Sequence, residues 1–235
     1  MTNPSMRDRL RAIRPPVNEL APFDTEAAAS DPRELFEQWL ETAITNDVSQ
    51  PTAMTLSTAT ADGAPSARTL LLKDLTAEGF WFASLTTAQK GADLTANPRA
   101  ALTFYWPEHG RQVRVVGTVR EGPRAVSERD FLARHPTARA RAMAGDQSEP
   151  LPDAGTVQSR MDAARHLLAL TPDFVPESWA AFVVEPETVE FWQAADGHEE
   201  SRLRYRRAGG AAGTEAGTEA DTAAGTDWVR ERLWP

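Results

Sequence analysis

Segments of alternating apolar and polar residues, separated by very short turns, constrain the fold of this chain most strongly. Residues 52–60, 66–73 and 79–84 follow one another in this way, joined by Ala-Asp-Gly and by a turn at Glu78 and Gly79. Links this short leave no room for a crossover helix, so consecutive strands should run antiparallel. The sequence therefore predicts an antiparallel meander. Further strands are expected at residues 99–106, 112–121, 179–185, 188–193, 203–207 and 228–233.

Helical patterns lie between these strands. A helix is expected from Ser30 or Asp31, because a capping residue precedes Pro32 and apolar residues then recur at helical spacing. Others are expected at residues 86–97, from Ser127 onward, and from Thr156 to residue 170, with 133–144 helical or loop-like and 146–155 a loop. The fold class is therefore mainly β with inserted helices (α+β), and an antiparallel β-barrel is favoured over a parallel sheet.

The chain divides into an arm and one domain. Residues 1–29 are polar, contain prolines and are weakly patterned, which predicts a flexible N-terminal arm. Residues 30–235 are expected to form a single domain. Within it, residues 208–226 are rich in Gly, Ala, Thr and Glu and have no large apolar residue, so this stretch is expected to be a disordered loop.

Composition excludes several classes of protein. The net charge of −9 argues against a general nucleic-acid binder. The chain has no cysteine, so disulfides and thiolate metal sites are excluded, and no histidine spacing is typical of a metal site. No apolar run has the length of a membrane span, and the N-terminus has no signal-peptide pattern, so a cytoplasmic location is expected.

Basic residues recur around the second predicted strand. In an extended strand Arg68, Leu70 and Leu72 share one face, and Thr69, Leu71 and Lys73 share the other. Another cation, Lys90, follows a short polar loop after the next strand. Several cations returning to one region favour a phosphate-bearing ligand. The alternative is that Arg68 and Lys73 are ordinary surface charges at the strand ends.

Six segments, taken in order, carry a family likeness. They are PTAMTLSTATADGAPSARTLLLK, FWFASLTTAQKGADLTANPRAALTFYW, RQVRVVGTV, the pair Gln147-Ser148, VEFWQ and WVRERLWP. Together they resemble the pyridoxamine 5′-phosphate oxidase family, which is built on the FMN-binding split barrel. AQKGADL, the FYW strand and MDAARHLLAL are closest in character to the flavin oxidases of phenazine biosynthesis. The resemblance implies a homodimer with FMN at the subunit interface.

The resemblance also implies which residues hold FMN. Gln89 and Lys90 would bind its phosphate, where the family usually has Arg-Lys, and Gln147 and Ser148 would reach across from the partner subunit. Gln112 would meet the isoalloxazine ring, and Trp192 and Arg202 would complete the pocket. The full set of implied cofactor contacts is Arg68, Thr69, Leu70, Leu71, Leu72, Lys73, Ala83, Ser84, Gln89, Lys90, Gln112, Gln147, Ser148, Trp192 and Arg202.

The substrate side departs from the vitamin B6 pattern. The family's Tyr, Arg and Ser phosphate clamp aligns with Asp130, Arg134 and Ala138, so only the arginine is kept. A second basic group is replaced by His198, Glu199 and Glu200, and carboxylates repel a substrate phosphate. The implied substrate contacts are Lys73, Arg134, His198 and Glu200.

Three functions remain open from the sequence. The first is an FMN-dependent oxidase that oxidises a reduced nitrogenous aromatic small molecule with O2 and gives H2O2, in a specialised, phenazine-like pathway. The second is a true pyridoxamine/pyridoxine 5′-phosphate oxidase. The third is a flavin-binding protein without turnover. In each enzyme reading the flavin drives the reaction and no side chain is assigned as a catalytic acid or base.

Overall fold

Antiparallel strands form the framework of the protein in the computed structural model, which describes residues 4–13, 21–151, 153–194, 200–209, 221–222 and 227–234. The helices are α1 (Met6–Arg11), α2 (Pro32–Thr45), α3 (Gln89–Ala96), α4 (Arg124–Ala133), α5 (Pro136–Ala144) and α6 (Ala154–Leu170), with a 3-10 turn at Pro107–His109. The strands are β1 (Ala53–Ala59), β2 (Pro65–Leu71), β3 (Asp74–Thr76), β4 (Gly79–Leu85), β5 (Arg99–Trp106), β6 (Arg111–Glu121), β7 (Trp179–Gln193), β8 (Ser201–Arg207), β9 (Asp221–Thr222) and β10 (Trp228–Arg232).

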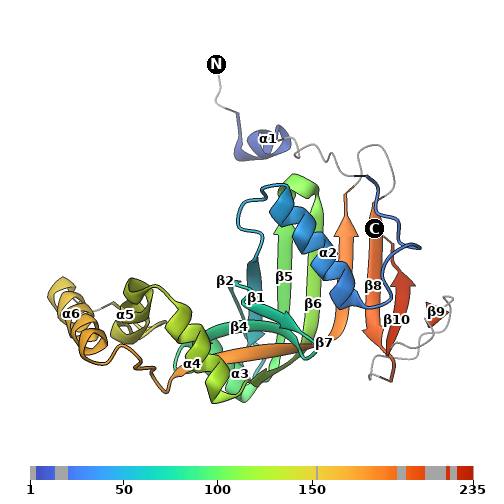
Figure 1. Ribbon diagram of the computed structural model, residues 1–235. Coiled ribbons are helices and arrows are strands. Elements are labelled where there is room, and N and C mark those ends of the chain that lie inside the picture. The colour runs from blue at the N-terminus through green and yellow to red at the C-terminus, as the bar shows by residue number, and fades with distance from the viewer. Residues whose placement is uncertain are drawn as a thin grey trace. The chain divides into compact units, whose positions relative to one another are not determined.

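The strands join in the order β2-β1-β5-β6-β7-β8-β10-β9, and β4 pairs with β3 and β7 (Figure 1). The antiparallel sheet with inserted helices confirms the predicted fold class, and the predicted β1–β2 hairpin is present with Ala53 opposite Leu71 and Ala59 opposite Pro65. The expected direct pairing of the second and third segments is wrong. The short strand β3 intervenes and pairs with β4, which pairs on its other side with β7.

β7 is one continuous strand, although the sequence predicted two strands separated near Pro186. Two glycines let other parts of the chain approach its backbone closely. A Cβ atom at Gly117 would lie 2.0 Å from the carbonyl oxygen of Glu185, and one at Gly79 would lie 2.1 Å from that of Val184. Only glycine fits at either position, since real Cβ atoms do not approach backbone so closely.

Two predicted helix starts are wrong. α4 begins after Pro123, and Ser127 is buried within it, where its hydroxyl accepts a hydrogen bond from the Ala181 N–H (2.9 Å). α6 is capped by Asp153, whose carboxylate accepts bonds from the backbone N–H and the hydroxyl of Thr156 (3.0 and 2.7 Å). Residues 136–144 are helical, and α2 begins after the predicted cap Asp31.

The chain forms two compact units. The first contains residues 1–51, 105–113 and 190–235, and the second contains residues 52–104 and 114–189. In the first, α2 buries Phe36 and Trp39, and Trp39 meets Phe191 edge to face, 5.2 Å between ring centroids. Residues 1–29, predicted to be a flexible arm, include α1, which has a capping box at Ser5 and Asp8. Most of the predicted loop 208–226 lies outside the described residues.

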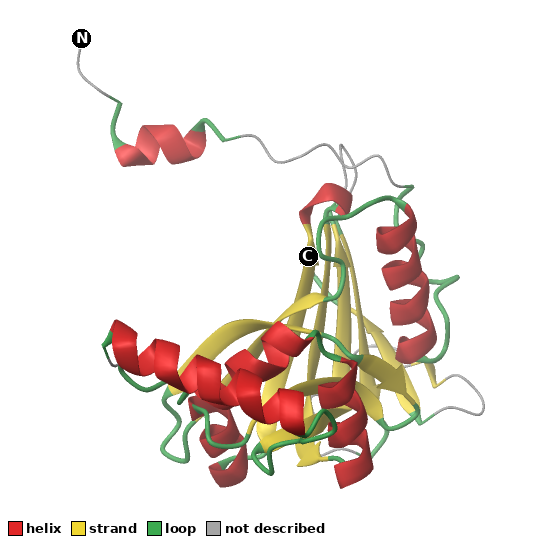
Figure 2. Ribbon diagram, turned by 60° about the vertical axis from the view of Figure 1, so that its left-hand side comes forward, coloured by secondary structure: helices red, strands yellow, loops and turns green. Residues whose placement is uncertain are grey.

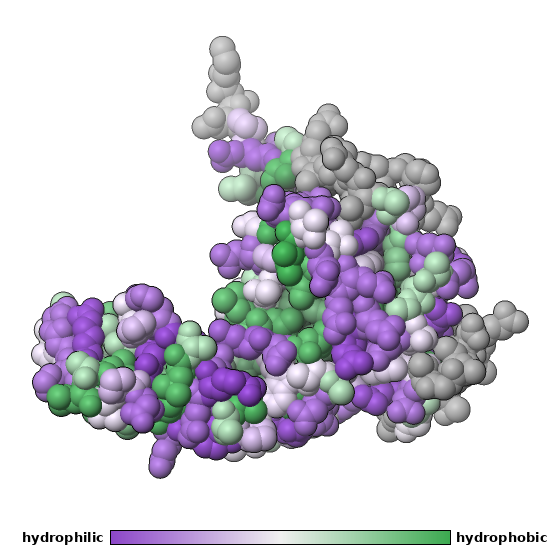
Figure 3. Space-filling view, in the orientation of Figure 1, coloured by the Kyte–Doolittle hydropathy of each residue, from purple (hydrophilic) through white to green (hydrophobic). Residues whose placement is uncertain are grey.

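The second unit carries the remaining helices. α5 and α6 pack against each other, in front of the strands in Figure 2. Only Ala164 of α6 is buried, and hydrophobic residues stay at the surface of this helical region, at the left of Figure 3. None of the helices in the described part of the chain is long and apolar enough to cross a membrane.

Candidate functional site

A cleft of about 500 Å³ lies in the second unit, between β2, β4, the start of α3 and the α4–α5 segment. This volume is ordinary for a small-molecule or cofactor site. The cleft brings together nine of the residues that the sequence assigned to cofactor or substrate: Thr69, Leu70, Leu71, Lys73, Ala83, Ser84, Lys90, Arg134 and Gln147.

Side chains alternate along β2 as the sequence predicted. Ser66, Arg68 and Leu70 are half-buried and alternate with the exposed Ala67, Thr69 and Leu71. The exposed Thr69 and Leu71 line the cleft together with the half-buried Leu70, while Arg68 faces the neighbouring strand and α3. Hydrophobic residues are visible in green over this strand region in Figure 3.

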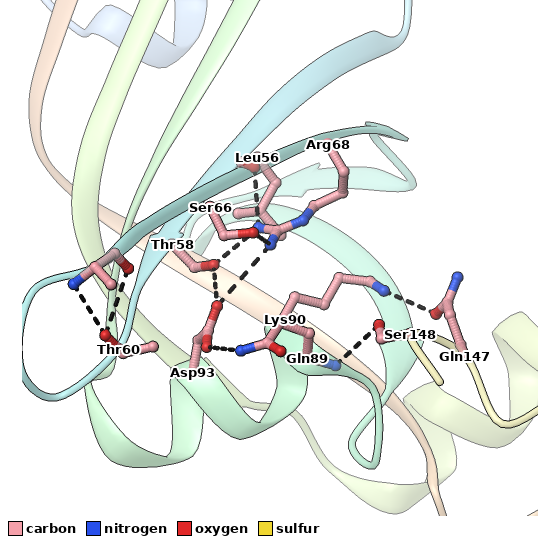
Figure 4. A network of polar contacts seen from close by, with 11 residues as sticks. Leu56, Thr58, Thr60, Ser66, Arg68, Gln89, Lys90, Asp93, Gln147 and Ser148 are labelled. Carbon is pink, nitrogen blue, oxygen red and sulfur yellow. Dashed lines mark hydrogen bonds and ion pairs between the residues drawn. The ribbon is translucent and has the colours of Figure 1, made fainter. Parts of the chain in front are cut away.

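Lys90, at the start of α3, lines the cleft. Figure 4 shows the polar contacts around it. Lys90 is only 5% exposed, and its Nζ donates to Oε1 of Gln147 (2.8 Å). The Gln89 N–H donates to the hydroxyl of Ser148 (3.3 Å). The N-cap residue, Ala88, has no side chain that could accept from the first N–H groups of the helix, so Ser148 supplies the acceptor for the Gln89 N–H.

A glycine makes the tight entry into α3 possible. A Cβ atom at Gly91 would lie 2.2 Å from the carbonyl oxygen of Thr86, so no other residue fits there without moving the backbone. The close approach brings the loop before α3 against the first turn of the helix, next to Lys90.

Arg68 is fixed beside this helix by groups from two strands. Its Nη1 donates to the carbonyl of Leu56 (3.1 Å) and to the hydroxyl of Thr58 (2.8 Å), and its Nη2 donates to Ser66 (2.7 Å). Burial lowers the pKa of Lys90, and the charge of Arg68 lowers it further. Two cations are thus held where they repel each other, an arrangement that an anion between them would stabilise.

These groups fit the phosphate of FMN. Lys90 and Gln147 line the cleft at the start of α3, and Arg68, Gln89 and Ser148 adjoin them without lining it. Charge-assisted bonds of this kind are the strongest that a protein offers to phosphate. The adjoining wall of Thr69, Leu70 and Leu71 is suited to an apolar ring system.

A second charged cluster lies at Lys73, in the same unit. Its Nζ lies 3.7 Å from Oδ1 of Asp130, whose other oxygen accepts a bond from the indole N–H of Trp179 (3.1 Å). The guanidinium of Arg134 lies 4.4 Å from the centre of the Trp179 ring. Burial lowers the pKa of Arg134, and Asp130 opposes this shift. A neighbouring hollow of about 380 Å³ is lined by Lys73 and Asp130.

Sequence reasoning missed the roles of two aspartates here. Asp130 appeared only as a departure from the family's clamp, and its ion pair with Lys73 gave no local signal. Asp93 was not singled out, although it follows Gln89 by one helical turn. Trp179 was expected only as part of a strand. It lines the cleft, donates a hydrogen bond to Asp130 and makes a cation–π contact with Arg134.

Some predicted contacts lie elsewhere. The residues Gln112, Trp192, Arg202 and Glu200 belong to the first unit and are not among those that line this cleft. There the indole N–H of Trp192 donates to Glu200 (3.1 Å), and Arg202 pairs with Glu190 (2.7 Å). His198 lies outside the described residues.

The placement of three further residues differs in detail. Leu72 is buried behind the cleft wall and does not line the cleft. Gln147 and Ser148, expected from the partner subunit, contact Lys90 and Gln89 of their own chain. These two side chains therefore already lie beside Lys90 and Gln89 within one chain.

Two family models match the chain. The one described as Pyridoxamine 5′-phosphate oxidase covers residues 40–177, more than half of the 235 residues. This chain belongs to the pyridoxamine 5′-phosphate oxidase family. Like the family, it is an FMN-dependent oxidoreductase. The second model, the Pyridoxine 5′-phosphate oxidase C-terminal dimerisation region, covers residues 179–235 and supports a homodimer.

Curated relatives within this family match almost the whole chain. The pyridoxine/pyridoxamine 5′-phosphate oxidase of Caulobacter vibrioides is 38% identical over 237 aligned positions, covering 99% of this chain and 96% of that protein. The enzyme of the same name from Actinobacillus succinogenes is 37% identical and covers 88% of this chain and 90% of its own length.

Solved structures give the same fold. PhzG from Burkholderia lata 383, solved in complex with tetrahydrophenazine-1-carboxylic acid, superposes with a TM-score of 0.80 at 27% identity, covering 93% of this chain and 99% of that one. A pyridoxamine 5′-phosphate oxidase-related, FMN-binding protein from Nostoc punctiforme has a TM-score of 0.63 at 15% identity, covering 85% and 97%, and supports the split-barrel fold.

Removing either cation should weaken FMN binding. We expect Arg68→Ala and Lys90→Ala each to cost ~1.5–3 kcal/mol, because each removes a charge-assisted contact to phosphate. Equilibrium titration of the flavin-free protein with FMN measures this loss. Arg165→Ala, on the exposed face of α6, is the matched control and should bind FMN as the wild type does. Unchanged affinity in both Arg68→Ala and Lys90→Ala would refute the placement of the phosphate.

FMN affinity should also fall as the pH rises into the alkaline range. The pKa of Lys90 lies below its ordinary value of 10.5 in the chain alone, and a bound phosphate dianion raises it. Between these two pKa values binding takes up a proton, so the dissociation constant increases with pH. FMN titrations at increasing pH measure the slope. Lys90→Gln should lose it, whereas a slope retained in that variant would assign the proton to another group.

Proposed function

We propose that the protein is an oxidase that removes two electrons from a reduced nitrogenous aromatic substrate and passes them to O2, giving H2O2, in a specialised, phenazine-like pathway. The observation that supports this substrate class is the ion pair between Lys73 and Asp130 beside the cleft. This ion pair disfavours a phosphorylated substrate electrostatically and is compatible with a neutral or singly charged one.

Asp130 changes what the Lys73 end of the cleft can bind. The carboxylate compensates the charge of Lys73 and also acts on Arg134. A substrate phosphate placed there would meet a cation already paired and a carboxylate that repels it. A neutral ring, or one with a single carboxylate, incurs a smaller electrostatic penalty. The Nε–H of Arg134 is buried and has no partner in the described structure, so Arg134 is the candidate donor to such a carboxylate.

A structural neighbour supports the same class of substrate. PhzG from Burkholderia lata was solved with tetrahydrophenazine-1-carboxylic acid, a reduced nitrogen heterocycle with one carboxylate and no phosphate. That ligand has the charge that the pairing of Lys73 and Asp130 favours.

The side chains of the cleft have separate roles in this proposal. Bound FMN supplies the two-electron chemistry. The phosphate is bound by Arg68, Gln89, Lys90, Gln147 and Ser148. The β2 wall orients the ring, and Lys73, Asp130 and Arg134 select the substrate. The substrate loses two electrons and two protons, and O2 takes up both to become H2O2. We further propose that Gln112, Trp192 and Arg202 reach FMN in the homodimer, with FMN at the subunit interface.

A true pyridoxamine/pyridoxine 5′-phosphate oxidase is the second candidate. Curated relatives of 37% and 38% identity carry that name, and Lys73 and Arg134 are both present at the cleft. These relatives establish the family. Asp130, however, stands where the family's phosphate clamp has a tyrosine, and its carboxylate would repel a substrate phosphate.

A substrate panel tests the choice between the two. Purified holoprotein would be assayed for O2 uptake and H2O2 release with dihydroaromatic nitrogen heterocycles, with and without a carboxylate, and with pyridoxine and pyridoxamine 5′-phosphates. We expect turnover of the reduced heterocycles and a preference for the carboxylate. Efficient turnover of the phosphates alone would favour the second candidate. Bound FMN with no turnover of any member would favour a flavin-binding protein without an oxidase activity.

Asp130→Asn should shift the preference toward phosphorylated substrates. The amide keeps an acceptor for the Trp179 indole but removes the negative charge beside Lys73. We expect the ratio of kcat/KM for pyridoxine 5′-phosphate over the carboxylated heterocycle to rise about tenfold, equivalent to roughly 1.4 kcal/mol. Asp74→Asn, which removes an exposed acid from the same neighbouring hollow, is the control. An unchanged ratio in Asp130→Asn would contradict the role of this charge.

A further inference from the structure

A buried carboxylate lies behind the phosphate-binding end of the cleft. Asp93 of α3 is 2% exposed, and its side chain faces β1 and β2 (Figure 4). Burying a carboxylate is costly unless hydrogen bonds and a positive charge compensate it. Its Oδ2 accepts from the hydroxyl of Thr58 (2.6 Å), its Oδ1 accepts from Nε2 of Gln89 (2.9 Å), and Nη2 of Arg68 lies 3.9 Å away.

Thr58 links this carboxylate to Arg68. A threonine hydroxyl has one hydrogen, and here it is directed to Asp93. The same oxygen is then left as an acceptor, and Nη1 of Arg68 donates to it at 2.8 Å. Asp93 thereby fixes the hydroxyl in the orientation that suits the guanidinium.

Asp93 also acts on the first turn of the helix. Through the Nε2 amide it holds the side chain of Gln89, the residue whose backbone N–H faces Ser148. Its charge offsets part of the repulsion between Arg68 and Lys90, because Asp93 raises the pKa of Arg68 against the effect of burial. One side chain thus connects two of the groups assigned to the FMN phosphate, Arg68 and Gln89.

We propose that Asp93 is a positioning residue for FMN, which holds Arg68 and Gln89 in the arrangement that receives the phosphate. The inference rests on the FMN site and is independent of the substrate proposed above. Asp93 touches no ligand in this scheme. It acts through Thr58 and Arg68 on one side and through Gln89 on the other.

The sign of the effect separates positioning from simple electrostatics. A carboxylate near a phosphate repels it, so an aspartate that acted only through its charge would lower FMN affinity, and its removal would raise it. Removal of a positioning residue lowers FMN affinity, because Arg68 and Gln89 are then no longer ordered in advance and must be ordered when FMN binds.

The test is a double-mutant cycle in the full-length protein, stripped of flavin and titrated with FMN. We expect Asp93→Asn to weaken binding about tenfold, and about twofold or less when Arg68 is already replaced by Met, since coupled residues are not additive. Additive losses, an unchanged affinity or a gain in Asp93→Asn would each overturn the proposal.

A second pair of variants addresses the link without removing the buried charge. Thr58→Val should weaken FMN binding, whereas Thr58→Ser, which keeps the hydroxyl, should restore it to within about twofold of the wild type. Equal losses in both variants would show that packing at this position matters and that the hydroxyl does not. Thermal unfolding of each flavin-free variant identifies any that fails to fold, and the Thr58 pair keeps the proposal testable if Asp93→Asn is one of these. Failure of the substrate panel would leave these titrations interpretable, because they measure FMN binding alone.

Discussion

The repulsion between Lys90 and Arg68 is the constraint around which the cofactor end of the structure is arranged. A lysine that is 5% exposed and a half-buried arginine are brought together from α3 and β2. Without compensation the chain would separate them, since both charges are partly desolvated. Arg68 therefore has hydrogen-bond partners on β1 and β2, Lys90 has Gln147, and Asp93 lies between the two elements.

The fold makes this arrangement possible through close backbone approaches. Gly91 allows the loop before α3 to meet the first turn of the helix, and this close approach determines the position of Lys90. Gly117 and Gly79 allow β6 and β4 to lie against β7, so β4 and the cleft residues Ala83 and Ser84 have a rigid support. Each glycine is required by the space around it.

Local features could be predicted from the sequence, and long-range contacts could not. The β1–β2 hairpin followed from a short turn between alternating segments, because turn length fixes register. β3 was missed because three residues are too few to show a period. Ser127 has the composition of a cap, but its hydroxyl is used by the N–H of Ala181, 54 residues away, which no local rule reveals. Lys90 was found because it follows a strand and a loop, whereas Asp93 gains its role only from Thr58 and Arg68 on other elements.

The two aspartates of the site show how burial decides what a carboxylate does. Asp93 is nearly inaccessible to solvent. Its charge is compensated by two neutral hydrogen-bond donors and by Arg68. Asp130 is more open, reaches the hollow beside the cleft, and pairs with Lys73, a cation that also lines the cleft. The first stabilises Arg68 beside Lys90, and the second offsets part of the charge of Lys73. This contrast suits a dianion beside Lys90 and, in the function proposed above, a neutral or singly charged ring beside Lys73.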